Sequence, residues 1–177
     1  MLRYFVAEKK IPGQDKQHHT IHRGDFRMAK TRVLFVCVQN SARSQMAAAL
    51  LNHEFGGEFE AESAGIEPGS LNPLAVESMH EIGIDISRNR TNDVFDFYRE
   101  GRRYSYVITV CDESSGERCP LFPGITKRLH WSFDDPATFT GPEEVKLKKT
   151  IKVRDEIQVQ IRQWVGELDN QSGKAKR

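Results

Sequence analysis

The sequence has only three cysteines, an odd number that is too few for a disulfide scaffold. It contains no apolar run of about 18 residues and no signal-like apolar stretch at its start, so we expect neither a membrane span nor secretion. Its 26 basic and 25 acidic residues leave a net charge of +1, which argues against nucleic acid or an anionic membrane as partner. We therefore predict a cytoplasmic protein with buried, metal-binding or reactive thiols.

The length of 177 residues suits one globular domain rather than two. Residues 1–30 are mostly polar and show no sustained periodicity, so we predict a flexible N-terminal extension there. Its histidines at 18, 19 and 22 lack a cysteine or carboxylate pair at ligand spacing, and we predict no metal site and no cofactor. The folded domain is expected at residues 31–170, followed by a polar tail at 171–177.

Short apolar runs alternate with amphipathic stretches along the domain. We predict strands at residues 33–36, 59–64, 104–110 and 128–131. A helix is expected at 44–55, and another begins at Pro73 and runs towards Ile82, with Gly83 as its stop. A last helix is indicated by an apolar stripe at steps of three and four: Val153, Ile157, Ile161, Trp164 and Leu168. This alternation predicts a parallel α/β sheet, with ligands beyond the carboxyl ends of its strands.

The segment from Cys37 to Ser44 lies at such a strand end, just before a helix. Backbone N–H groups of this loop can surround a tetrahedral oxyanion, and the Arg43 guanidinium can bind two of its oxygens. The same positive groups favour the thiolate of Cys37, which makes it the candidate nucleophile. Asn40 and Ser44 are expected to hydrogen-bond within the loop or to the thiolate. The predicted oxyanion-binding residues are Val38, Gln39, Asn40, Ser41, Ala42, Arg43 and Ser44.

Other interpretations of these residues stay open at this point. Cys37 can be a buried cysteine beside an unrelated arginine, although its place between strand and helix counts against this. Cys111 can be a core strand residue and Cys119 incidental; zinc is a weaker alternative, because two cysteines eight positions apart have no CxxC partner. A carboxyl group of the Asp-Asp-Pro sequence at 134–136 can act as a general acid over the anion, or the sequence can simply form a turn.

Eight blocks of sequence occur in one order: Val36-Cys37-Val-Gln-Asn-Ser-Ala-Arg-Ser-Gln-Met-Ala47, Ser63-Ala-Gly-Ile-Glu67, Leu71-Asn-Pro73, Gly83-Ile-Asp-Ile-Ser87, Thr109-Val-Cys111, Arg118-Cys-Pro120, His130-Trp-Ser-Phe-Asp-Asp-Pro136 and Val153-Arg-Asp-Glu-Ile157. With them, residues 33–165 resemble the low-molecular-weight protein tyrosine phosphatase family and, within it, the thioredoxin-coupled arsenate reductases. The resemblance implies a doubly wound α/β fold with a four-stranded parallel sheet flanked by helices. It also implies that Asp135 is the general acid.

In the mechanism that the resemblance implies, Cys37 attacks arsenate, Cys111 attacks Cys37 and expels arsenite, and Cys119 attacks Cys111. Thioredoxin would then reduce the Cys111–Cys119 disulfide. We therefore predict that residues 31–170 form the catalytic domain of an arsenate reductase, with phosphate or sulfate as competing anions. Its predicted catalytic residues are Cys37, Arg43, Cys111, Cys119 and Asp135. The alternatives are a phosphomonoesterase like the low-molecular-weight phosphatases and, less favoured, a thiol-based binder of arsenite or metal.

Three positions depart from the family pattern. Ala137 stands where tyrosine-phosphate enzymes usually carry an aromatic residue, which favours a small inorganic oxyanion. Gln39 stands where many relatives have glycine, so we expect some backbone strain there and a side chain that points outward. Ala48 replaces an acidic residue that helps bind potassium in some relatives, so potassium dependence is not expected. Other parts of that site are matched by Asn40, Ser63 and Asp85.

Overall fold

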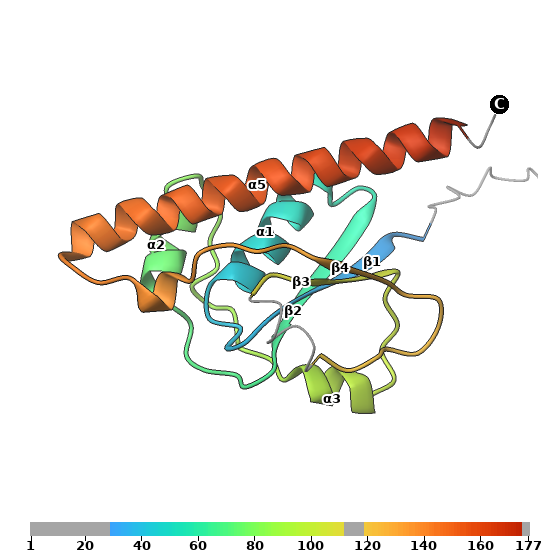
Figure 1. The fold of residues 1–177 in the computed structure, drawn as a ribbon, viewed down its shortest axis with the longest axis horizontal. Helices are drawn as coiled ribbons and strands as arrows, with labels where there is room; N and C mark the ends of the chain where they lie inside the picture. Colours follow the sequence, from blue (N-terminus) through green and yellow to red (C-terminus); the bar gives the residue numbers. More distant parts are fainter. Residues whose placement is uncertain (1–28, 112–118, 175–177) are drawn as a thin grey trace, which may run out of the picture.

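The sheet has four parallel strands in the order β2-β1-β3-β4 (Figure 1). The computed structural model describes residues 29–111 and 119–174, and the expectations for residues 1–28 and 112–118 lie outside this part of the chain. The strands are β1 Thr31–Cys37, β2 Phe59–Gly65, β3 Tyr106–Thr109 and β4 Lys127–His130. The predicted four-stranded parallel sheet is confirmed.

Helices cover both faces of the sheet. They are α1 Arg43–Phe55, α2 Pro73–His80, α3 Val94–Arg99 and α5 Glu143–Lys174, with a short 3-10 helix, η1, at Pro136–Thr138. Figure 1 shows α1, α2 and α5 on one face and α3 on the other. The fold is therefore doubly wound, as predicted.

The central strand β1 explains why the core has two parts. Side chains of a strand alternate between the faces of its sheet. Val33 and Phe35 accordingly pack in the core under α1 and α5, whereas Leu34 and Val36 pack in a second core with α3. All four are completely buried, which requires the continuous apolar run that marks a strand covered on both faces.

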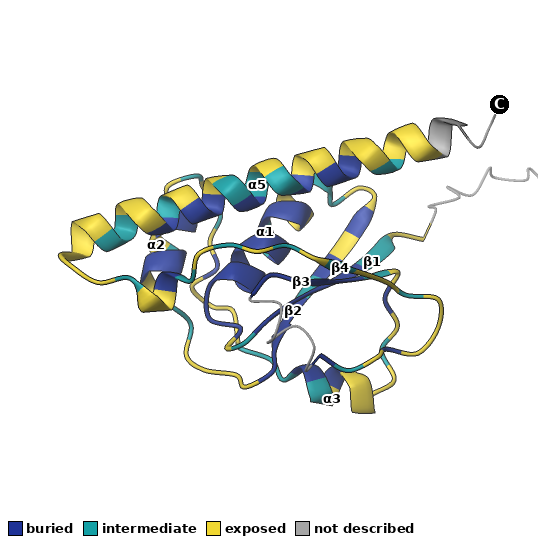
Figure 2. Cartoon of the chain, in the orientation of Figure 1, coloured by how far each residue is buried: buried dark blue, intermediate teal, exposed yellow. Residues whose placement is uncertain are grey.

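Helix α5 lies across the molecule with its apolar stripe turned towards α1 and the sheet (Figure 2). Trp164 anchors it, because its ring contacts those of Phe59, Tyr106 and Trp131. The helix continues to Lys174, beyond the boundary at residue 170 that we expected for the folded domain. Helix propagation adds one hydrogen bond per residue, and no proline interrupts this stretch. None of the helices in the described residues is long and apolar enough to cross a membrane.

The ends of α2 follow from its sequence. The Asn72 side chain accepts a hydrogen bond from the Leu74 N–H at 2.9 Å and caps the helix, and Pro73 occupies the first turn, where its missing N–H costs nothing. Gly83 has φ +78°, a left-handed conformation that ends the turn after the helix. Both signals were predicted from the sequence, and together they define where α2 begins and where the turn after it ends.

Candidate active site

The Cys37 sulfur lies at the carboxyl end of β1 and takes part in two hydrogen bonds. The Asn40 backbone N–H donates to the Cys37 Sγ at 3.1 Å. The Ser44 Oγ lies 3.0 Å from the same sulfur, in a hydrogen bond that either atom can donate, and it accepts a hydrogen bond from the Asn40 Nδ2 at 2.9 Å. Asn40 and Ser44 therefore act within the loop as expected, and their donors suit a negatively charged sulfur.

The loop's carbonyl groups are held by the segment that follows β2. Backbone N–H groups of this segment bind four loop carbonyls at 2.9–3.1 Å. The donor and acceptor pairs are Ile66 to Cys37, Glu67 to Val38, Gly69 to Gln39 and Asn72 to Ser41. A trans peptide directs its C=O and N–H to opposite sides, so the N–H groups of the same peptides point to the inside of the loop. This arrangement leaves the N–H groups of the loop placed to bind an oxyanion, and the loop is therefore the candidate oxyanion cradle.

The start of α1 completes the cradle. The helix has no side-chain cap at Ala42, so the N–H groups of its first turn are available to an anion together with the positive end of the helix dipole. Arg43 is the first residue of α1, and its side chain is 5% exposed. Its charge is thus buried in the protein instead of exposed to solvent.

Backbone strain in the loop falls on Asn40 and not on Gln39, so that expectation was wrong. Asn40 has φ +52°, the one non-glycine residue with positive φ in the described part of the chain. Asparagine tolerates this conformation better than most residues. The Gln39 side chain is exposed, as we expected.

The Asn40 side chain is completely buried and hydrogen-bonded on both sides. Its Oδ1 accepts from the Asn92 N–H at 2.8 Å and from the Gln45 Nε2 at 3.1 Å. The Gln45 amide in turn accepts from the Asn89 Nδ2 at 3.0 Å. Two N–H donors thus occupy the Asn40 oxygen.

Gly65 lets β2 approach the loop closely. A Cβ atom at Gly65 would lie 2.7 Å from the Asn40 nitrogen and 2.8 Å from the Val38 oxygen, closer than real Cβ contacts. Any other residue would therefore push the loop out of place. Sequence reasoning missed this role of Gly65. It also missed Gln45 and Asn92, which carried no local signal of a hydrogen bond to the loop.

Asp135 lies directly against Arg43, although 92 residues separate them. The Arg43 Nη2 donates to the Asp135 Oδ2 at 2.5 Å, and its Nη1 donates to the Phe133 carbonyl at 3.1 Å. The second Asp135 oxygen accepts from the Ala137 N–H at 3.0 Å, so the carboxylate also caps η1. The predicted acid and the predicted anion-binding arginine thus meet at the mouth of the loop.

The three cysteines are buried and none of them is in a disulfide, but they occupy different parts of the core. Cys37 and Cys111 belong to the core under α1 and α5, whereas Cys119 packs in the core with α3. The structure therefore brings Cys37 and Cys111 to one side of the sheet and Cys119 to the other. Burial raises the pKa of the Cys119 thiol to about 11, against the opposing effect of the Arg128 charge.

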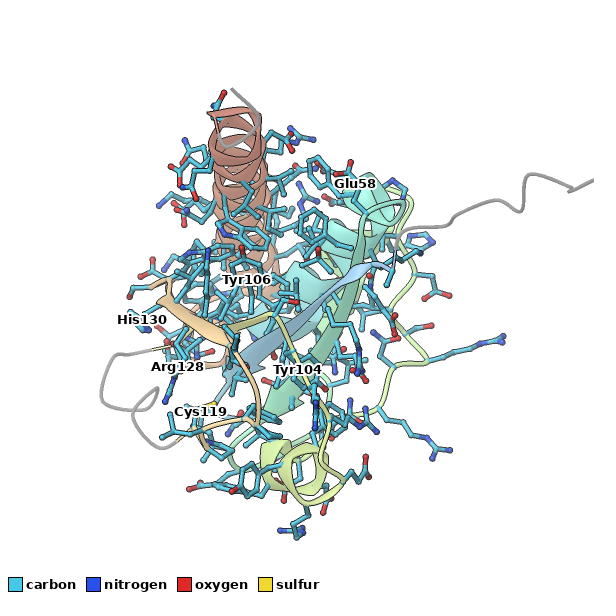
Figure 3. All side chains as sticks on the ribbon, turned by 90° about the vertical axis from the view of Figure 1, so that its right-hand side faces the viewer. Glu58, Tyr104, Tyr106, Cys119, Arg128 and His130 are labelled. Carbon is cyan, nitrogen blue, oxygen red and sulfur yellow. The ribbon has the colours of Figure 1, made fainter. Side chains whose placement is uncertain are left out.

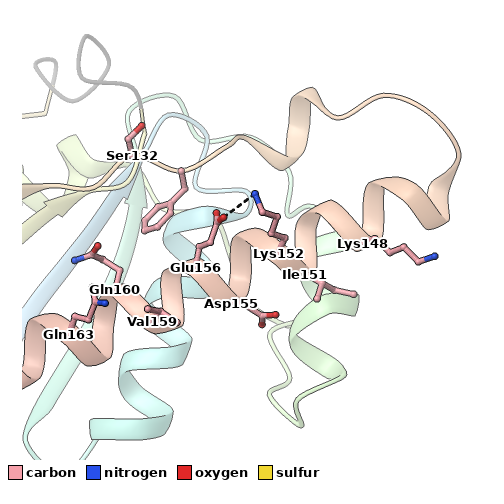
Figure 4. A pocket seen from close by; sticks show the side chains of 10 residues that line it. Ser132, Lys148, Ile151, Lys152, Asp155, Glu156, Val159, Gln160 and Gln163 are labelled. Atoms are coloured by element: carbon pink, nitrogen blue, oxygen red, sulfur yellow. Dashed lines mark ion pairs between the residues drawn. The ribbon is translucent and has the colours of Figure 1, made fainter.

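Two hollows lie near these residues. One of about 410 Å³ adjoins the loop at Gln39 and Ser41 and is bounded on its other side by Pro136 and Ala137. A larger groove of about 790 Å³ follows α5 beside Ser132 (Figure 4). The larger groove includes none of the predicted site residues, so the smaller hollow, which opens beside the anion loop, is the better candidate for the substrate entrance.

Comparison with known proteins agrees with this geometry. Residues 32–174 match the family described as low molecular weight phosphotyrosine protein phosphatase. An arsenate reductase of Shouchella clausii is 41% identical over 137 residues, which cover 77% of this chain and 96% of that protein.

Solved structures show the same likeness. A thioredoxin-dependent arsenate reductase of Corynebacterium glutamicum is similar with a TM-score of 0.62 at 31% identity, over 80% of this chain and 63% of that one. An arsenate reductase in a phosphate-binding state also has a TM-score of 0.62, at 25% identity over 77% of this chain and 98% of that one. The chain therefore belongs to the low molecular weight phosphotyrosine protein phosphatase family, on the branch whose relatives include arsenate reductases.

Proposed function

We propose that this protein is an arsenate reductase that passes its oxidation along three cysteines to thioredoxin. The observation that carries the proposal is the Cys37 loop, an oxyanion cradle built around a hydrogen-bonded thiol, in a chain with two further cysteines that are in no disulfide. A phosphatase needs the loop but not the further thiols. Relatives in the same family that are named arsenate reductases support the same conclusion.

The first step belongs to the loop. Arsenate is held by the inward N–H groups and by the Arg43 guanidinium, and the Cys37 thiolate attacks the arsenic atom. One arsenate oxygen leaves as water after it takes a proton from Asp135, which lies at the mouth of the loop beside Arg43. Position 137 carries alanine instead of an aromatic side chain, although Phe139 lines the same hollow.

Two thiol exchanges follow. Cys111 attacks the Cys37 sulfur, the sulfur–arsenic bond breaks, and its electron pair leaves with arsenite, so arsenic(V) becomes arsenic(III) and a Cys37–Cys111 disulfide forms. This pair shares one side of the sheet. Cys119 then attacks Cys111 and releases Cys37. Because Cys119 packs on the other side, it must leave its present place for that step.

We propose thioredoxin as the reductant of the final disulfide, and phosphate and sulfate as anions that compete for the loop. The named thioredoxin dependence of one structural neighbour and the phosphate-binding state of another support both partners. We place the reaction in the cytoplasm, where thiols stay reduced and a disulfide relay can be reset.

The test is a coupled assay with arsenate, thioredoxin, thioredoxin reductase and NADPH. NADPH consumption should depend on arsenate and should fall to background in Cys37→Ser, Cys111→Ser and Cys119→Ser. A phosphatase would behave differently, because hydrolysis of a phosphomonoester would need Cys37 and tolerate loss of both later cysteines. Consumption that is independent of arsenate, or unaffected by Cys111→Ser, would rule out the reductase.

A further inference from the structure

Cys119 is poorly prepared to act as a nucleophile by itself. Its side chain is 4% exposed in an apolar cluster that includes Val36, Val107 and Phe122, and its sulfur has a long contact of 3.8 Å to the Pro120 carbonyl. Burial raises the pKa of its thiol to about 11, so little thiolate exists near neutral pH. A reaction that needs this thiolate needs a nearby positive charge.

Arg128 supplies such a charge from the neighbouring strand. It lies in the middle of β4, opposite Val107 of β3, and its Nη2 donates a hydrogen bond to the Cys119 carbonyl at 3.4 Å. Its charge lowers the pKa of the Cys119 thiol, against the effect of burial. Figure 3 shows Cys119 and Arg128 next to each other at this edge of the sheet. The arginine thus binds the backbone of the cysteine and also acts on its sulfur.

The other ionisable side chain in this cluster, Tyr104, adds no charge near the Cys119 sulfur. Tyr104 packs in the same core, but its hydroxyl donates to the Glu62 Oε2 at 2.9 Å, and burial raises its pKa, so it stays neutral. Arg32 and Arg102 face this region as well, and both are ion-paired with Glu62.

We propose that Arg128 is a positioning residue for the last thiol exchange, where it binds the carbonyl of the resting Cys119 and favours the thiolate before Cys119 moves to Cys111. This inference rests on the proposed cysteine relay. In the step concerned, the Cys119 thiolate attacks the Cys111 sulfur of the Cys37–Cys111 disulfide. The new Cys111–Cys119 bond forms, the old bond breaks, and Cys37 leaves as thiolate. The proton of Cys119 goes to solvent. Neither arsenate binding nor arsenite release involves Arg128.

The first test measures the thiol directly and needs no arsenate. In a Cys37→Ser/Cys111→Ser background, Cys119 is the remaining thiol, and the pH dependence of its alkylation by iodoacetamide gives its apparent pKa. Arg128→Gln should raise this value by roughly 0.5 to 1, the size expected for loss of one charge whose effect on the sulfur is partly screened by solvent. Arg128→Lys should retain most of the effect.

Lys127→Gln is the matched control, because Lys127 is the adjacent cation of β4 and its side chain lies over the Tyr106 ring, in the core on the other face. It should leave the value unchanged. Should Arg128→Gln fail to fold, as judged by circular dichroism, Arg128→Met makes the same test with a neutral side chain of similar length. An unchanged value in the neutral variants, or an equal rise in Lys127→Gln, would overturn the inference.

The second test follows one turnover of the full chain with arsenate and without thioredoxin. Arg128→Gln should release arsenite at the parent rate but form the Cys111–Cys119 disulfide roughly 3- to 10-fold more slowly near pH 7, with the deficit shrinking as pH rises. A structural defect would slow both steps and would not disappear at high pH. If no variant, the parent included, releases arsenite, the proposed function fails, while the alkylation test still decides the role of Arg128.

Discussion

Asp135 and the substrate anion have to share one arginine, and this predicts that Asp135→Asn binds anions better and reacts more slowly. Both terminal nitrogens of the Arg43 guanidinium are engaged, one by the Asp135 carboxylate and one by the Phe133 carbonyl. An oxyanion that binds in the loop must displace the carboxylate from Arg43 or accept it as a close negative neighbour. Asparagine removes the charge, and its oxygen can still accept from the Ala137 N–H to cap η1.

The magnitude follows from the burial of the pair. A hydrogen bond to a charged group contributes about 1.5–3 kcal/mol. The Arg43 side chain is 5% exposed, but that of Asp135 is 32% exposed, so solvent screening lowers the figure to about 1–2 kcal/mol. Phosphate should therefore bind roughly 5- to 30-fold more tightly to Asp135→Asn. The loss of a general acid should at the same time lower the rate of arsenite release roughly 100-fold or more.

Calorimetric titration with phosphate and a single-turnover measurement of arsenite release together test this reasoning. Asp134→Asn is the control, because Asp134 is an exposed neighbour of equal charge that acts on Lys152. It should change phosphate affinity much less and leave the rate nearly unaltered. The reasoning is refuted if Asp135→Asn binds phosphate no more tightly than the parent, or if Asp134→Asn tightens binding equally.

Three further predictions concern the scaffold. In Gly65→Ala the new Cβ atom should push the loop away from β2 at Val38 and Asn40 and weaken phosphate binding at least tenfold. The free energy of unfolding in urea should fall by about 1–3 kcal/mol. Unchanged phosphate affinity would contradict this prediction. Trp164→Ala should cost about 3–5 kcal/mol in the same unfolding assay, whereas the half-exposed Val159→Ala should cost less than about 0.5 kcal/mol. The raised pKa of Cys119 means that the unfolded thiol loses its proton first, so the melting temperature should fall as pH rises from about 9 towards 11, less steeply in Cys119→Ala.

The order of helices and strands was predictable because each depends on neighbours in the sequence. The buried run of β1, the Asn72 cap and the stripe of α5 are local patterns, and the structure confirms all three. The identity of the cysteine loop was predictable for the same reason, since it needs only eight consecutive residues between a strand and a helix.

Tertiary structure decided how the loop is held and what it faces. The strain at Asn40, its bonds to Gln45 and Asn92, and the close approach of Gly65 depend on packing between separate segments. A sequence of loop residues cannot reveal these contacts, because the residues that enforce the loop's shape lie up to 52 positions away.

The cysteines show most clearly which features the sequence predicts and which depend on the tertiary structure. The resemblance to the arsenate reductases already implied a relay of oxidation, and the Asp-Asp-Pro sequence already suggested an acid. Only the folded chain determines that Asp135 meets Arg43 across 92 residues. It also determines that Cys119 packs on the opposite side of the sheet from Cys37, with Arg128 at its carbonyl. Strand alternation and crossover connections set which face each side chain occupies, and these are properties of the assembled sheet.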